Sequence, residues 1–157
     1  MEDVINMRVD DGYQEGEEIQ VVAFRLGNEE YAVDILYVQE IIRLLNITRV
    51  PRSAQHIEGV VNLRGSIIPI ANLHSRFNLQ LSDNQDDKRI IVFKFDEVQV
   101  GIIVDEVSEV LRIHQNDIEA ADKVYGTLEA DHIKGIAKVG ERLLILLDLA
   151  KIFEAGW

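Results

Sequence analysis

Residues 56–77 read HIEGVVNLRGSIIPIANLHSRF, and residues 132–153 read HIKGIAKVGERLLILLDLAKIF. The two stretches align without a gap at a constant offset of 76 residues. Apolar residues mostly face apolar residues, and the identical positions are His56/His132, Ile57/Ile133, Gly59/Gly135, Leu73/Leu149 and Phe77/Phe153. The chain is therefore built twice from one unit, and the shared positions belong to its scaffold.

The two copies differ most at one corner. The first carries Asn62-Leu63-Arg64-Gly65 where the second carries Lys138-Val139-Gly140-Glu141. Glycine in second place suits a type I′ hairpin turn at Arg64-Gly65, and glycine in first place suits a type II′ turn at Gly140-Glu141. An exposed turn arginine is usually only solvated, but arginine is enriched at binding hot spots. Arg64 is therefore a candidate contact residue.

The duplication extends upstream at a smaller offset. Residues 21–26 (VVAFRL) match residues 90–95 (IIVFKF) at an offset of 69, and residues 38–43 (VQEIIR) match residues 107–112 (VSEVLR) at the same offset. The growth of the offset from 69 to 76 indicates seven residues inserted between Arg112 and His132.

These limits predict the domain organisation. We expect a disordered acidic leader over residues 1–18, a barrel subdomain over residues 19–81, a polar linker over residues 82–88 and a second barrel subdomain over residues 89–157. The sequence leaves open whether the two subdomains exchange strands.

Short segments rich in Val and Ile, punctuated by Gly, Asn and Asp, predict five β-strands in each copy. They are residues 21–26, 31–35, 38–44, 60–63 and 67–70, and then 90–95, 99–104, 107–113, 136–139 and 143–147. Short helices are expected within residues 71–79 and 149–153. Because closure removes exposed edges, each copy is expected to form a small barrel. A barrel of about sixty residues has a thin core alone, so the two should pack together in an all-β fold.

Composition excludes several classes of protein. The chain has 157 residues, 47% hydrophobic and 28% charged, which is typical of a soluble globular protein. The absence of cysteine excludes disulfides and thiolate metal sites. No apolar run is long enough to span a bilayer, and the acidic start lacks a signal sequence. The net charge of −12 argues against nucleic acid as a partner. We expect a cytoplasmic protein.

No motif of a nucleotide-binding loop, zinc protease or serine hydrolase is present, so neither an enzyme nor a cofactor or metal is expected. His56 and His132 are equivalent, which favours a repeated structural role over a shared site. Asp105-Glu106 is interpreted as a hairpin connection at the end of a strand rather than an acid–base pair. In strand geometry Val38, Glu40 and Ile42 share one face. That face is either half-buried with Glu40 solvated or a docking strip, and the residues alone favour the first.

The sequence resembles the bacterial chemotaxis coupling protein family CheW. Residues 24–35 (FRLGNEEYAVDI), followed by residues 38–41 (VQEI), resemble the opening of that family. Residues 59–73 (GVVNLRGSIIPIANL) resemble its most recognisable motif, GVxNLRGxIxPxxxL. Matching segments in copy two are residues 101–105, 107–111 and 143–148. The resemblance covers nearly everything after Glu18.

The resemblance implies a fold, a role and partners. The family fold is two pseudo-symmetric, five-stranded, Src-homology-3-like barrels packed on a shared hydrophobic centre. Its members are non-catalytic and couple chemoreceptors to the histidine kinase CheA in membrane-associated receptor arrays. The receptor's cytoplasmic helical hairpin docks in the groove between the barrels, and the C-terminal regulatory domain of the kinase docks barrel to barrel.

The resemblance also implies site residues. Receptor-contact positions carry over to Val38, Glu40, Gly59 and Arg64, which all match in residue type. Kinase contacts carry over to Ile47 and Thr48, although the preceding Leu44-Leu45 makes that strip more apolar than expected. The alternative from a different class is a small-ligand-binding double barrel that uses the same groove.

Overall fold

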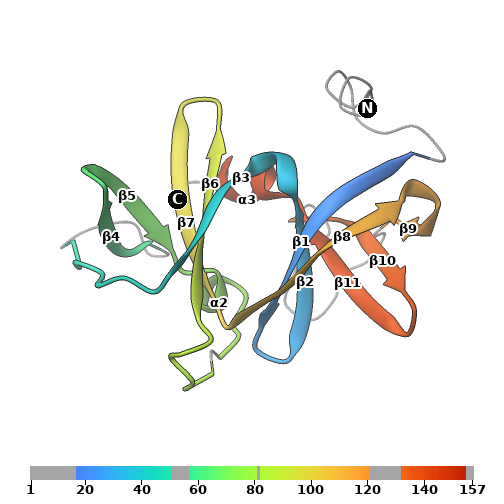
Figure 1. The fold of residues 1–157 in the computed structure, drawn as a ribbon, viewed down its shortest axis with the longest axis horizontal. Coiled ribbons are helices and arrows are strands. Elements are labelled where there is room, and N and C mark those ends of the chain that lie inside the picture. Colours follow the sequence, from blue (N-terminus) through green and yellow to red (C-terminus); the bar gives the residue numbers. More distant parts are fainter. Residues whose placement is uncertain (1–16, 51–56, 81, 121–131, 155–157) are drawn as a thin grey trace.

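The computed structural model describes residues 17–50, 57–80, 82–120 and 132–154 (Figure 1). Copy one supplies β1 (Glu18–Leu26), β2 (Glu29–Asp34), a 3-10 turn η1 (Ile35–Tyr37), β3 (Val38–Arg43), β4 (Ile57–Leu63), β5 (Ser66–Ala71) and α2 (Leu73–Arg76). Copy two supplies β6 (Arg89–Phe95), β7 (Val98–Val104), β8 (Glu106–His114), η2 (Gln115–Asp117), β9 (Ile118–Glu119), β10 (Ile133–Val139), β11 (Arg142–Leu147) and α3 (Leu149–Glu154). The ten predicted strands and both helices are confirmed, while β9 was not predicted.

Glu18 was placed in the predicted leader but is the first residue of β1. Residues 1–16 of that leader lie outside the described residues.

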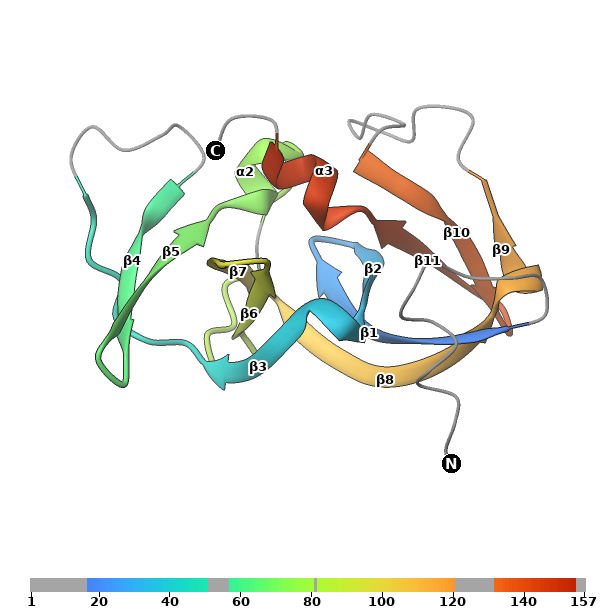
Figure 2. The same cartoon turned by 90° about the horizontal axis from the view of Figure 1, so that it is seen from above.

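The two sheets exchange strands between the copies. One sheet, the first barrel, has the order β3-β6-β7-β5-β4, and the other, the second barrel, has the order β8-β1-β2-β11-β10-β9. The β1–β2 hairpin therefore lies among strands of copy two, and the β6–β7 hairpin lies among strands of copy one (Figure 2). Neither residues 19–81 nor residues 89–157 form a sheet from their own strands alone.

Short pairings close each barrel. In the first barrel Thr48 and Val60 exchange two backbone hydrogen bonds of 2.9 Å, which join the chain after β3 to β4. In the second barrel β9 pairs with β10, with Ile118 opposite Ala137 and Glu119 opposite Ile136. Because β9 follows β8 through η2, this pairing joins the two ends of the sheet order. The predicted barrels of an all-β fold are thus confirmed.

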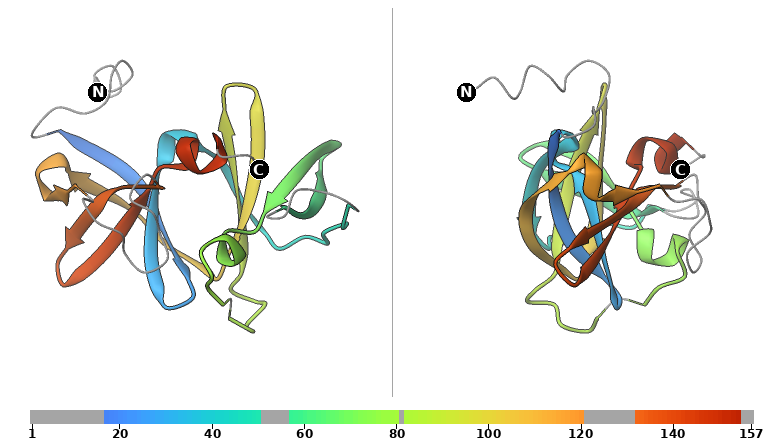
Figure 3. Two further views of the ribbon diagram at one scale, coloured as in Figure 1. Left: turned by 180° about the vertical axis from the view of Figure 1, so that it is seen from behind. Right: turned by 90° about the vertical axis from the view of Figure 1, so that its right-hand side faces the viewer.

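The exchanged hairpins separate three hydrophobic cores. In β6, Ile91 and Phe93 face a shared core between the barrels, while Ile90 and Val92 face the interior of the first barrel. β1 divides its side chains in the same way between the shared core and the second barrel. The helices α2 and α3 lie on one side of the molecule and add Leu73 and Leu149 to the shared core (Figure 3). Strands that are apolar on both faces are therefore buried on both faces.

Turn chemistry follows the position of glycine. Arg64 and Gly65 have φ of 52° and 91°, and a type I′ turn requires both to be positive. Gly140 has φ of 63° while Glu141 is not in the positive region, as a type II′ turn requires. Both predictions for these hairpins are confirmed, and the type I′ turn presents Arg64 at the tip of the β4–β5 hairpin.

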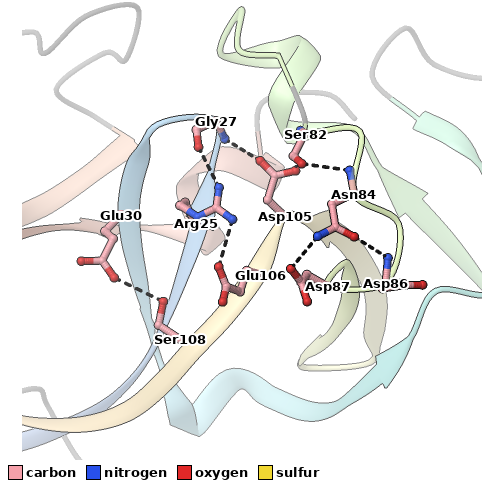
Figure 4. A network of polar contacts seen from close by, with 10 residues as sticks. All are labelled: Arg25, Gly27, Glu30, Ser82, Asn84, Asp86, Asp87, Asp105, Glu106 and Ser108. Atoms are coloured by element: carbon pink, nitrogen blue, oxygen red, sulfur yellow. Dashed lines mark hydrogen bonds and ion pairs between the residues drawn. The ribbon is translucent and has the colours of Figure 1, made fainter.

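A polar network anchors the segment between the two copies (Figure 4). The buried carboxylate of Asp105 accepts 2.8 Å hydrogen bonds from the backbone N–H groups of Gly27 and Ser82. Glu106 pairs with Arg25 at 2.9 Å. Asp105 thereby ties the linker to the β1–β2 turn. Asp105-Glu106 does stand at a strand end, but the predicted hairpin is wrong, because β7 and β8 lie in different sheets and the chain crosses here from one barrel to the other.

Candidate functional site

The predicted strip lies along β3, at one edge of its sheet. Burial alternates along the strand, with Val38, Glu40 and Ile42 partly buried and the residues between them exposed. Val38 lies opposite Phe93 and packs against the shared core. The strand bulges between Val38 and Glu40, so Val38 packs against the shared core while Ile42 packs against the interior of the first barrel. The single face predicted for Val38, Glu40 and Ile42 is therefore wrong, because the bulge turns the two ends of the strip toward different cores.

Glu40 meets Arg64 across the first barrel. The Arg64 guanidinium donates from Nη2 to Oε1 of Glu40, joining β3 to the tip of the β4–β5 hairpin. The Glu40 side chain is 27% exposed and that of Arg64 is 68% exposed. The hydrogen bond to Glu40 raises the pKa of Arg64. Asn62 Oδ1 accepts from the Gly65 N–H at 2.8 Å, which braces the turn. Two of the predicted receptor-contact residues are thus bonded to each other.

Gly59 has a different role, because it is buried. A Cβ at this position would overlap the carbonyl oxygen of Thr48 and lie 2.7 Å from Cγ2 of Ile47. The missing side chain therefore allows the close approach that closes the first barrel. Gly59, predicted as a receptor contact, lies against Ile47 and Thr48, predicted as kinase contacts.

Ile47 and Thr48 divide between core and surface. Ile47 is partly buried and packs against the interior of the first barrel. Thr48 is exposed while its backbone pairs with Val60. Leu45, in the unusually apolar strip before them, is 37% exposed. The surface that copy one offers here therefore includes Thr48 and Leu45.

The second barrel repeats this geometry with a different arginine. Glu109 stands at the offset of 69 from Glu40, and Arg142 donates to it at 2.6 Å. Gly135, the counterpart of Gly59, lies close to Ile118 and Glu119 in the same way. The sequence comparison missed Arg142 because it aligned Gly140 with Arg64. The arginine that fills this role in copy two stands two residues after Gly140, as the first residue of β11.

Of the described histidines, His74 and His132 are partly or fully buried among packed side chains rather than gathered into a metal or catalytic site. His132 is buried with its ring centroid 6.3 Å from that of Phe77, while its counterpart His56 lies outside the described residues. Burial lowers the pKa of His74. Among the described residues there is no group of three or more His, Asp or Glu side chains placed to hold a metal ion. Within the same ranges, none of the helices has the length and apolar character needed to cross a membrane.

Comparison with known proteins identifies the family. The model of the CheW-like domain matches residues 20–156. "Chemotaxis protein CheW" of Klebsiella aerogenes is 40% identical over 87% of this chain and 82% of its own length. "Chemotaxis protein CheW" of Treponema pallidum is 33% identical over 88% of this chain and 84% of its own length.

A solved structure gives the same result for the fold. The scaffolding protein TtCheW of Thermoanaerobacter tengcongensis superposes with a TM-score of 0.81 at 34% identity, covering 93% of this chain and 94% of its own. The chain therefore belongs to the CheW-like family and is a chemotaxis scaffold protein rather than an enzyme.

Proposed function

We propose that this scaffold couples the cytoplasmic tips of chemoreceptors to the histidine kinase CheA. The receptor's helical hairpin docks between the barrels against Val38 and the Glu40–Arg64 pair, with Gly59 holding the backbone beneath. The observation that supports this most directly is the ion pair itself, which fixes an exposed guanidinium beside a half-buried apolar strand.

The chemistry of the pair suits a helical partner. Arg64 uses one nitrogen for Glu40, and in the described part of the chain its Nε and Nη1 have no other acceptor. A helix that lays an apolar face along β3 can place a carboxylate against those donors. Charge complementarity of this kind fixes orientation and favours association more than it raises affinity.

The kinase contact is proposed on the neighbouring surface. The C-terminal regulatory domain of CheA docks barrel to barrel against the first barrel at Ile47 and Thr48. Contact between unlike surfaces is heterologous and closes into rings when the rotation allows it. Individually weak contacts gain avidity when many copies assemble. The protein therefore acts in the cytoplasm, recruited to membrane-associated receptor arrays.

The receptor contact is tested by Arg64→Ala in the full chain. We expect affinity for a chemoreceptor hairpin fragment to fall about tenfold, an ordinary loss for a charged hot spot. Arg43→Ala is the control, since Arg43 is exposed on the opposite face of the same strand. Binding of the kinase regulatory domain and the melting temperature should stay unchanged in both variants. Equal receptor affinity of wild type and Arg64→Ala in a calorimetric titration would remove this contact from the proposal.

The coupling role is tested by reconstitution. The kinase and a receptor fragment are mixed with and without this chain, and autophosphorylation is followed as receptor ligand or receptor modification state is changed. We expect receptor control only when the chain is present. Control that persists without it would contradict the proposed function.

A further inference from the structure

The two barrels carry a glutamate at equivalent positions, each bonded to an arginine that comes from a different position of the facing hairpin, and they differ in one further charge. Glu40 corresponds to Glu109, and each accepts an arginine from the facing hairpin. The offsets of 69 and 76 also match the neighbouring positions in pairs, which are Gln39/Ser108, Gln99/Glu30 and Ser66/Arg142. The neutral Gln99 of β7 thus stands where β2 carries the charged Glu30.

In the second barrel the arginine is held by two carboxylates, through one N–H of each guanidinium nitrogen. Arg142 donates from Nε and Nη2 to both carboxylate oxygens of Glu30, at 3.0 and 2.9 Å, and from Nη1 to Glu109 at 2.6 Å. The hydroxyl of Ser108 donates to Glu30 at 3.2 Å, an interaction visible in Figure 4. All three guanidinium nitrogens are used, and the fork on Glu30 is the bidentate arrangement that holds arginine most firmly. The hydrogen bonds that Arg142 donates to Glu30 and Glu109 raise the pKa of Arg142. The hydrogen bond from Arg142 lowers the pKa of Glu30.

In the first barrel the arginine is held by one carboxylate, that of Glu40. Gln99 donates its amide N–H to Gln39 Oε1 at 2.6 Å, so position 99 offers a neutral amide group in place of a carboxylate. Arg64 keeps a single bond to Glu40, and its side chain is 68% exposed where that of Arg142 is 37% exposed. The first barrel pairs one carboxylate with one arginine, whereas the second pairs two carboxylates with one arginine.

We propose that residues 99 and 30 decide which barrel accepts the partner. Glu30 occupies Arg142 and closes the second barrel's copy of the site. Gln99, its neutral counterpart, leaves Arg64 with donors for a carboxylate on an incoming helix. This inference rests on the proposed function in taking that helix to be the receptor hairpin.

Two physical effects act in the same direction. A partner carboxylate can take the bidentate Nε–Nη2 edge of Arg142 only by displacing Glu30, and the displaced carboxylate would lose its charge-assisted bonds. Glu30, Glu109 and Arg142 together carry one negative charge, whereas Glu40 and Arg64 together are neutral, and Arg25 near Glu30 is balanced by its own partner Glu106. The second site therefore repels an acidic group more than the first. Specificity by repulsion of this kind discriminates between surfaces that are otherwise alike. The pseudo-symmetric fold therefore presents one docking site of this chemistry in place of two.

The test is Gln99→Glu in the full chain. The Gln99–Gln39 bond occupies the place of the Glu30–Ser108 bond, so a carboxylate at position 99 should lie beside Glu40 as Glu30 lies beside Glu109. The exposed Arg64 side chain, which comes from the turn before the strand position of Arg142, then turns toward both carboxylates. We expect affinity for the receptor hairpin fragment to fall about tenfold, as for loss of a charged hot-spot contact. Gln99→Met is the matched control, because it removes the bond to Gln39 without adding charge, and it should bind like the wild type. Glu30→Gln should leave affinity at the first barrel unchanged and add a second, weaker binding event at the second barrel, seen as a stoichiometry above one in a calorimetric titration.

A spectroscopic measurement separates this inference from the proposed function. Hydrogen exchange of arginine Nε–H groups, followed by ¹⁵N NMR without any partner, should be slow at Arg142 and fast at Arg64 in the wild type. Gln99→Glu should slow exchange at Arg64, and Glu30→Gln should accelerate it at Arg142. Equal protection of Arg64 and Arg142 in the wild type overturns the inference, as does unchanged exchange at Arg64 in Gln99→Glu.

The remaining outcomes are also decisive. Slowed exchange at Arg64 in Gln99→Glu with undiminished receptor binding rejects the role of position 99 while the proposed function stands. A wild type that fails to bind the receptor fragment contradicts the proposed function, and with it the part of the inference that names the receptor. The hydrogen-exchange rates of the arginine Nε–H groups then still decide whether Glu30 holds Arg142 in the second barrel.

Discussion

Gly59 and Gly135 show how much one missing side chain does in this fold. Each lies where the barrel closes, and a Cβ would come within 2.7 Å of a neighbouring isoleucine methyl and would crowd a backbone carbonyl. A flexible side-chain tip can move aside, but the backbone that closes the barrel cannot move without weakening the pairing. These glycines therefore belong to the scaffold first, and under the proposed function Gly59 acts on kinase binding through the position of Ile47 and Thr48.

We expect Gly59→Ala and Gly135→Ala to destabilise the protein by similar amounts, about 1–3 kcal/mol each, as overpacking usually does. Urea unfolding followed by far-UV circular dichroism measures this. Only Gly59→Ala should also weaken binding of the kinase regulatory domain, because only Gly59 underlies Ile47 and Thr48. Unchanged unfolding midpoints would show that the strand pairings beside Gly59 and Gly135 can move to accept a Cβ without loss of unfolding free energy.

The Glu30–Arg142 pair predicts a pH dependence of stability. Arg142 lowers the pKa of Glu30 below its ordinary 4.5, so the folded protein favours the ionised form. The stabilisation is complete above that ordinary value and is lost as pH falls through the lower folded pKa. Since both side chains are partly exposed, we expect it to be about 1 kcal/mol or less. The difference in unfolding free energy between wild type and Glu30→Gln should be largest near pH 7 and vanish at acid pH.

At the scale of elements, local sequence determines the strands but not their partners. Runs such as residues 90–93 (IIVF) predicted β6 because β-branched and aromatic residues favour a pleated, buried surface. The two residues of β9 are too few to produce such a signal, and they lie in the stretch where copy two is longer. Pairing depends on contacts remote in sequence, so the exchange of the β1–β2 and β6–β7 hairpins was left open.

The site shows the same division. Glu40 and Arg64 were identified by their resemblance to a family motif, and their contact follows from β3 and the β4–β5 turn facing each other. Arg142 and Glu30 were missed, because no alignment places Arg142 opposite Arg64 and Glu30 has no unusual sequence context. Only the packing of β2 beside β11 shows that the two side chains meet.

The linker anchor gives a prediction at this scale. Asp105→Ala removes a buried acceptor and leaves two backbone N–H groups, at Gly27 and Ser82, without their partner. Buried unsatisfied groups cost about 1–3 kcal/mol, and because Gly27 and Ser82 are only partly buried we expect a loss of about 1 kcal/mol in unfolding free energy. Asp117→Ala, at an exposed position in η2, is the control and should unfold like the wild type. Equal midpoints for the two variants would show that the linker needs no anchor.

At the scale of the molecule, strand exchange makes the two copies one folding unit. β1 makes its longest pairing with β8, and β2 pairs with β11, so copy one cannot complete its sheet from its own strands. The shared core likewise draws on β1, β2, β6 and β7. The boundary near residues 82–88 therefore divides the sequence without dividing the structure.

We expect a fragment of residues 19–81 to be unfolded in isolation, and so to lack the dispersed amide resonances of the full chain. Mixing it with residues 82–157 should restore them if the fragments associate as the strands do here. The intact chain should unfold in one transition with coincident far- and near-UV circular dichroism. An independently folded 19–81 fragment would show that the exchanged strands are dispensable.

Strand exchange also has a consequence for synthesis on the ribosome. The β1–β2 hairpin is made first, yet Val22 pairs with Val110, and Tyr31 lies beside Ile145 near the end of the chain. Long-range pairing of this kind slows folding, and a strand whose partner has not been made exposes an unpaired edge. At about 5–20 residues per second, that edge stays open for several seconds on each growing chain. Nascent chains should therefore depend on chaperone protection until the final hairpin has emerged.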